Sequence, residues 1–186
     1  MDHSDKNTLL FDKQGNPLNP DGSLKIEIVE NIDQITDEDF NNPYRSVQLP
    51  TLPENVDVAI AANGRPVIIK KNVFEKNREG HKEISSSVSR MILTEALYSP
   101  NLYGQSRPIS NPWYRILVKE QNKTNAVIVL DVYQCKQNVE IVGWRKIDGK
   151  GLERMKRQSA REDGQLLILS PDTSRVGGSP FRSSEN

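Results

Sequence analysis

The sequence predicts an α+β domain. We expect two N-terminal helices followed by a four- to five-stranded antiparallel sheet, with an N-terminal hairpin and an extra basic helix before the last strand. Two observations predict this class. Apolar residues recur at helical spacing in two adjacent segments after residue 70, and three segments after residue 112 alternate as strands do. The three strand segments are joined by short connections, which favour an antiparallel meander with helices on one face.

Residues 1–55 are predicted to form an acidic, largely disordered leader. Turn dipeptides and spaced prolines dominate this segment, and only residues 24–29 and 37–40 suggest a short strand and a turn of helix. Residues 1–41 carry ten acids and three bases, a net charge of −7, and the chain is neutral overall, so residues 42–186 carry +7. A basic body suggests an anionic partner, although an unevenly charged, solvated surface explains the same numbers.

The folded unit is expected to span residues 56–170, with a disordered tail at 171–186. Alternation of Val56, Val58 and Ile60 before Asn63-Gly64 predicts a hairpin, because both turn positions favour positive φ. The segment "NVFEKNREG" predicts a short helix that ends at Gly80. A second helix, capped by serine, follows in "SSSVSRMILTEALYS" and stops before Pro100.

After a polar loop, three strands are predicted in "WYRILVKE", "AVIVLDVYQ" and "VEIVGWRK". The segment "GKGLERMKRQSARED" predicts a helix closed by Gly164, and "QLLILS" predicts the last strand.

Several classes of function are disfavoured by composition. One cysteine and two histidines argue against a disulfide or a structural zinc site, and the sequence contains no phosphate-binding loop or nucleophile elbow. We expect no metal and no cofactor. No apolar run approaches the roughly 20 residues that span a bilayer. The first residues lack the apolar core of a signal peptide, so we expect a cytoplasmic protein or a piece of a larger one.

Strand alternation selects a candidate binding face. If Ile116, Val118 and Ile128 face the helices, the opposite face carries Arg115, Tyr133 and Arg145, with Trp113 and Asp131. Arginines beside a tyrosine can hold a phosphodiester. The same pattern is also expected of an antiparallel sheet that shows one polar face to water.

The predicted basic helix provides a second candidate surface. Its cations recur at intervals of four, three and four residues and so line one face, and Lys146 lies just ahead of them; the helix cations are Lys150, Arg154, Arg157 and Arg161. Such a face suits an RNA or DNA backbone. A solvated face or a contact for an acidic protein would use the same residues.

The segments "HKEISSSVSRMILTEALYSPNLYG", "WYRILVK", "AVIVLDVY" and "VEIVGWRK" resemble the phage-type branch of the barnase–EndoU–colicin–RelE-like (BECR fold) nucleases. Such domains occur at the C-termini of polyvalent proteins of phages and mobile elements. The resemblance covers residues 56–170, and it suggests that the chain is part of a larger polypeptide.

The resemblance implies an endoribonuclease of toxin or phage-effector type that cleaves tRNA or mRNA without metal. An acidic immunity protein would be a second partner. In this scheme His81 is the acid or base, Arg145 and Arg115 bind the phosphate, and Tyr133 orients the substrate or donates a proton. The sequence departs from the family in having "GWRK" where a serine or threonine is expected beside the arginine. The alternative is therefore an inactive module on the same fold that binds nucleic acid or protein.

Overall fold

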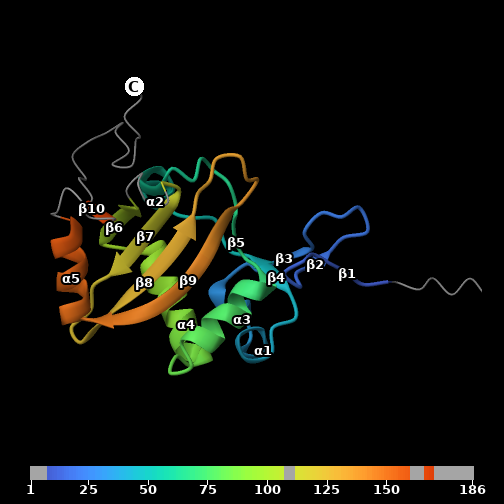
Figure 1. Ribbon diagram of the computed structural model, residues 1–186, viewed down its shortest axis with the longest axis horizontal. Coiled ribbons are helices and arrows are strands. Elements are labelled where there is room, and N and C mark those ends of the chain that lie inside the picture. The colour runs from blue at the N-terminus through green and yellow to red at the C-terminus, as the bar shows by residue number, and fades with distance from the viewer. Residues whose placement is uncertain (1–7, 107–111, 160–165, 170–186) are drawn as a thin grey trace, which may run out of the picture.

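The computed structural model describes residues 8–106, 112–159 and 166–169 (Figure 1). The predicted α+β class is confirmed. The described residues form an eight-stranded mixed sheet in the order β10-β6-β7-β8-β9-β5-β4-β3. At its centre is an antiparallel meander of four strands: β6 (Leu102–Ser106), β7 (Tyr114–Lys119), β8 (Thr124–Asp131) and β9 (Val139–Asp148).

The sheet is wider than the predicted four to five strands. The predicted polar loop after Pro100 contains β6, and β10 (Leu166–Leu169) pairs with β6 at one edge. At the other side, β5 (Val67–Ile69) runs parallel to β9, and β4 (Ser46–Gln48) and β3 (Ile26–Ile28) follow. Of these strands, β4 and β6 were not predicted, and at three and five residues they are too short to show a clear alternation.

The segment predicted to be a leader contributes strands to the sheet and apolar side chains to the hydrophobic core. The expected short strand and helical turn correspond to β3 and α1 (Asp37–Asn41), and a capping box between Thr36 and Asp39 begins α1. A 3₁₀ turn (Ile32–Gln34) precedes α1. Apolar side chains from this part of the chain are buried in the main core: Val29, Ile32, Ile35, Phe40, Val47, Leu49 and Leu52.

The predicted hairpin is wrong in its first arm, which is helix α2 (Glu54–Ile60). Val56 and Ile60 are buried one turn apart, whereas Val58 is 48% exposed. A short apolar run fits either period, and here the i, i+4 pair decides. The turn itself is as predicted, because Asn63 and Gly64 have φ of 57° and 72°.

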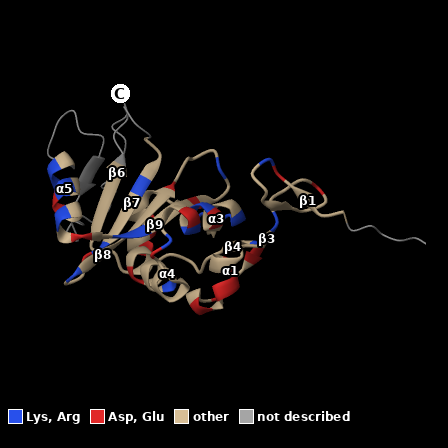
Figure 2. Ribbon diagram, turned by 60° about the horizontal axis from the view of Figure 1, so that its bottom comes forward, with Lys and Arg blue, Asp and Glu red and all other residues tan. Residues whose placement is uncertain are grey.

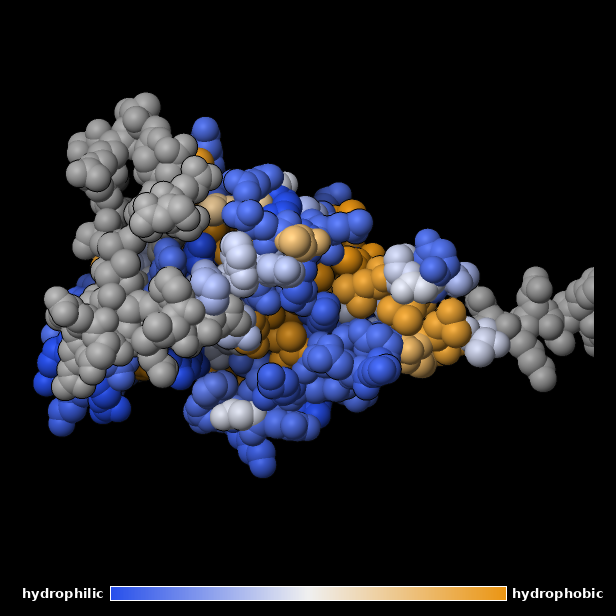
Figure 3. Space-filling model, turned by 45° about the horizontal axis from the view of Figure 1, so that its top comes forward, coloured by the Kyte–Doolittle hydropathy of each residue, from blue (hydrophilic) through white to orange (hydrophobic). Residues whose placement is uncertain are grey.

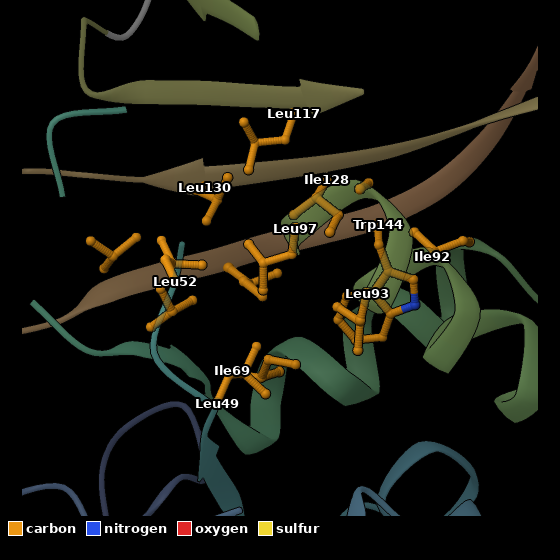
Figure 4. Close-up of a cluster of buried hydrophobic side chains, with 14 of the residues drawn as sticks. Leu49, Leu52, Ile69, Ile92, Leu93, Leu97, Leu117, Ile128, Leu130 and Trp144 are labelled. Atoms are coloured by element: carbon orange, nitrogen blue, oxygen red, sulfur yellow. The ribbon is translucent and has the colours of Figure 1, made fainter. Parts of the chain in front are cut away.

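Helices cover both faces of the sheet, where one face was predicted. The core face carries Leu117, Ile128 and Leu130 and lies against α3 (Lys71–Gly80), α4 (Ser86–Ile92) and the π-helical turn Leu93–Leu97 (Figure 4). The opposite face, which we call the groove face, carries Val118 and Val127 and packs against α5 (Gly149–Ser159). Two covered faces explain why the central strands read as nearly continuous apolar runs.

A small hairpin of β1 (Leu10–Phe11) and β2 (Pro17–Leu18) stands away from the sheet. Leu9 and Phe11 are 71% and 52% exposed, and Figure 3 shows an apolar patch at this end of the molecule.

Candidate functional site

The site begins at an open edge of β9. Strand β5 pairs with β9 only at Val139 and Glu140, so helix α3 takes over as the neighbour of the strand further along. There the Trp144 backbone N–H donates a hydrogen bond of 2.9 Å to Asn77 Oδ1. Gly143 permits this approach, because a Cβ at that position would lie 3.2 Å from the same oxygen.

His81 lies where α3 ends. Its backbone N–H donates to the Asn77 carbonyl at 2.9 Å, and its own carbonyl accepts from Ile84 N–H in the turn that leads to α4. The side chain is 33% exposed, and Nδ1 lies 3.4 Å from Glu83 Oε1, an ion pair when the ring is protonated. The imidazole is thus held at a helix junction with access to solvent.

His81 and Arg145 line the same hollow, which has a volume of about 250 Å³. The end of α3 forms one wall, with Lys76, Gly80 and His81. The groove face and the edge of β9 form the floor and the other wall, with Val127, Val129, Val142, Gly143 and Arg145. An imidazole and two cations therefore surround an apolar floor.

A second hollow of about 280 Å³ continues from Arg145 to α5, and Arg154 and Gln158 line it. We call the two hollows together the β9 groove, and Arg145 belongs to both. Leu152 and Met155 fix α5 to the sheet and leave its basic side outward (Figure 2). Within the described part of the chain, the exposed side chains Lys150, Arg154 and Arg157 have no ion pair, whereas Lys156 contacts Glu120 and Glu153.

Not every predicted cation reaches the groove. Lys146 pairs with Ala126 of the core face, so it lies on the face of β9 opposite to Arg145. Arg161 lies outside the described residues.

Arg115 is not on the open face, which corrects the predicted alternation of its strand. It pairs with Leu130 of the core face and is 4% exposed, and its Nη1 donates to the Pro112 carbonyl at 2.7 Å. Burial lowers the pKa of its guanidinium to about 10, which leaves it charged at neutral pH. Because β7 has apolar residues of both parities, alternation alone assigned its faces wrongly by one residue.

Tyr133 lies beyond the end of β8, away from Arg145. It lies six positions after Val127, the partner of Arg145, which is about 20 Å along an extended chain. Its ring meets that of Trp113 edge-on, with centroids 5.3 Å apart. Arg65 Nη1 donates a hydrogen bond to the Tyr133 carbonyl at 2.7 Å, which ties this corner to the turn after α2. The structure therefore brings together His81 and Arg145, but not Arg115 or Tyr133.

Sequence reasoning missed Asn77 and Lys76 as site residues. A signal for Asn77 exists: it lies three positions after the buried Phe74, and so an amide falls within the apolar stripe of α3. Lys76 has no such signal, because exposed lysines are common on helices.

Among the residues that the structure describes, no group of three or more His, Cys, Asp or Glu side chains could hold a metal ion. In the same residues, every helix is too short or too polar to cross a membrane.

Residues 19–159 match the family model described as large polyvalent protein-associated domain 13. The match contains both walls of the β9 groove and leaves out the β1–β2 hairpin. No curated protein and no solved structure matches the chain significantly.

Proposed function

The chain belongs to the family of large polyvalent protein-associated domain 13, and on that premise we propose that it binds an RNA backbone along the β9 groove and cleaves it. The observation that carries this proposal is the shared hollow, with His81 on one wall and Arg145 on the other. The family description also fits a domain that works within a larger polypeptide.

The chemistry that suits these residues is transesterification. The 2′-oxygen of a ribose attacks the adjacent phosphorus and gives its proton to a base, and the bond to the 5′-oxygen breaks as that oxygen takes a proton. His81 is the side chain suited to move these protons, and Arg145 can bind two phosphoryl oxygens at once. Lys76, the other ionisable side chain on the hollow, replaces Tyr133 as the second proton donor in this proposal.

The dimensions of the groove agree with such a substrate. At about 250 Å³, the first hollow is smaller than the ~300–1,000 Å³ pockets that bind drug-sized ligands, and it suits a phosphate with its ribose. The second hollow leads to the basic side of α5, where Arg154 can bind the next phosphates of the strand.

A second candidate is a module that binds nucleic acid without cleaving it. The observation that favours it is the position of Tyr133 and Arg115 outside the hollow, which leaves His81 without the partners that the nuclease resemblance implies. The two candidates differ in cleavage and agree in binding, so both quantities must be measured.

The test compares wild type with His81→Ala on end-labelled single-stranded RNA in excess chelator. We expect cleavage that leaves a cyclic or 3′-phosphate, and a loss of 10² to 10⁴ in rate in the variant, the usual weight of one acid–base group. His3→Ala, which alters the only other histidine, is the matched control and should cleave as wild type does.

RNA with 2′-O-methyl groups should bind and resist cleavage, because it lacks the attacking hydroxyl. Binding without cleavage in wild type would establish the second candidate. Cleavage that chelator abolishes and magnesium restores would indicate a different nuclease class.

A further inference from the structure

We propose that Asn77 is a positioning residue, which holds His81 and Arg145 at a fixed separation across the hollow. The inference rests on the proposed function of the β9 groove and adds to it the part that sets its geometry. Asn77 is 8% exposed and belongs to α3, whereas Arg145 belongs to β9.

Asn77 is bonded to both walls. Its backbone carbonyl accepts from the N–H of His81 at 2.9 Å. Its side-chain Oδ1 accepts, also at 2.9 Å, from the N–H of Trp144, the residue directly before Arg145. Asn77 therefore connects the backbone of His81 to β9, the strand that carries Arg145.

The strand end of this link is itself fixed. Trp144 is 2% exposed, and its Nε1–H donates to Ser89 Oγ at 2.9 Å. Its ring meets those of Phe40 and Phe74 edge-on, with centroids 6.0 and 5.9 Å away. Figure 4 shows the indole among the core side chains beside α4. Because Trp144 cannot shift easily, its hydrogen bond to Asn77 fixes the end of α3 relative to β9.

An apolar residue at position 77 would suit the packing of α3, but it could not accept the hydrogen bond from the Trp144 N–H. The Trp144 N–H is buried and has no strand partner on that side in the described residues, so it needs an acceptor at one place. Gly143 keeps that place open, because a Cβ there would approach Asn77 Oδ1 to 3.2 Å. The bond forms only at one position of α3 relative to β9. That position fixes the width of the hollow.

Asn77→Leu tests the inference, because leucine is similar in shape and lacks the acceptor. We expect kcat for RNA cleavage to fall on the order of 10²-fold, the effect of a displacement of about 1 Å. KM should change much less, since the cations of α5 are untouched.

The matched control is Ser89→Ala, which removes the other acceptor of Trp144. It loses a buried hydrogen bond of the same length but keeps both bonds of Asn77, and the ring contacts with Phe40 and Phe74 still hold Trp144 in place. Thermal unfolding should show similar losses of stability in the two variants, whereas kcat should fall only in Asn77→Leu. Equal losses of kcat, or wild-type kcat in Asn77→Leu, would overturn the inference.

Gly143→Ala provides a second variant in case Asn77→Leu does not fold. Its methyl group displaces the link without removing it, so a smaller loss of kcat is expected. Unchanged kcat in a folded Gly143→Ala protein would count against the proposal.

A titration with inorganic phosphate, followed by the NMR signal of the His81 ring, separates this inference from the proposed function. Phosphate should shift the signal in wild type and Ser89→Ala, and the shift should be lost in Asn77→Leu. If wild type cleaves no RNA, the proposed cleavage fails and the titration still decides the role of Asn77. That role is contradicted if the His81 signal of wild type does not shift with phosphate, or if it shifts as much in Asn77→Leu as in wild type.

Discussion

Each face of the central sheet carries one of the two candidate arginines that lie on strands, and their surroundings are opposite. Arg115 lies on the core face, 4% exposed, with its guanidinium against the carbonyl of Pro112. Arg145 lies on the groove face, exposed, between the two hollows. Residue type and strand position are therefore not enough to place a side chain, because a shift of one residue changes which face the side chain belongs to.

The two faces should respond differently to mutation. The core face is covered by helices and packs into the main core, so changes there should cost stability and spare the groove. The groove face is only partly covered, so changes there should cost binding or cleavage and spare stability.

The largest effect is expected at Ile35 on the core-face side, in the segment that the sequence assigns to a leader. Ile35 is fully buried, so Ile35→Ala should lower the free energy of unfolding by about 2–5 kcal/mol. Ile28, which is 70% exposed, provides the control, and Ile28→Ala should change it by less than about 0.5 kcal/mol. Urea unfolding measures both. Equal, small effects would show that this segment is not part of the cooperative unit.

The arginines themselves give the next effect. Arg145→Ala should lower the RNA cleavage rate by about 10² to 10³, as loss of one charge-stabilising donor does, with little change in unfolding. Arg115→Leu should do the reverse, lowering the free energy of unfolding by about 1–3 kcal/mol because it leaves the carbonyls of Pro112 and Tyr114 without their donor. Paired rate and unfolding measurements check this. If Arg115→Leu lowered the cleavage rate without lowering the free energy of unfolding, the contrast between the two faces would be wrong.

The elements that could be predicted from sequence are those whose patterns are long or end in a clear signal. Ser85 accepts from Val88 N–H and begins α4 as expected of a serine cap, and the three central strands form the antiparallel meander. Strand β4 was missed because three residues show no period, and its place in the sheet depends on β5, which is distant in sequence from its partner β9.

The candidate site was predictable in part for similar reasons. His81 and Arg145 stand out by residue type, but only the folded chain shows that α3 ends beside β9. Arg115 was misplaced because Ile116, Leu117 and Val118 are all apolar, so alternation does not select a face. Asn77 acts on a strand 67 positions away, a contact that no local pattern contains.

The smallest effect is expected on the affinity for RNA, at the α5 side of the groove face. Reversing two charges in Arg154→Glu with Arg157→Glu should weaken binding and leave the fold intact, since both side chains are exposed. If each arginine binds one phosphate of a single strand, the slope of log affinity against log salt should fall by about 1.4, at 0.7 per contact. Lys13→Glu with Lys25→Glu makes the same change in net charge between β1 and β2 and just before β3, elements that lie at the other end of the molecule from α5 (Figure 1), and should leave the slope as in wild type. Equal changes of slope in both double variants would mean that RNA binding depends only on the net charge of the protein. An unchanged slope in the α5 variant would mean that the basic side of α5 is an ordinary solvated surface.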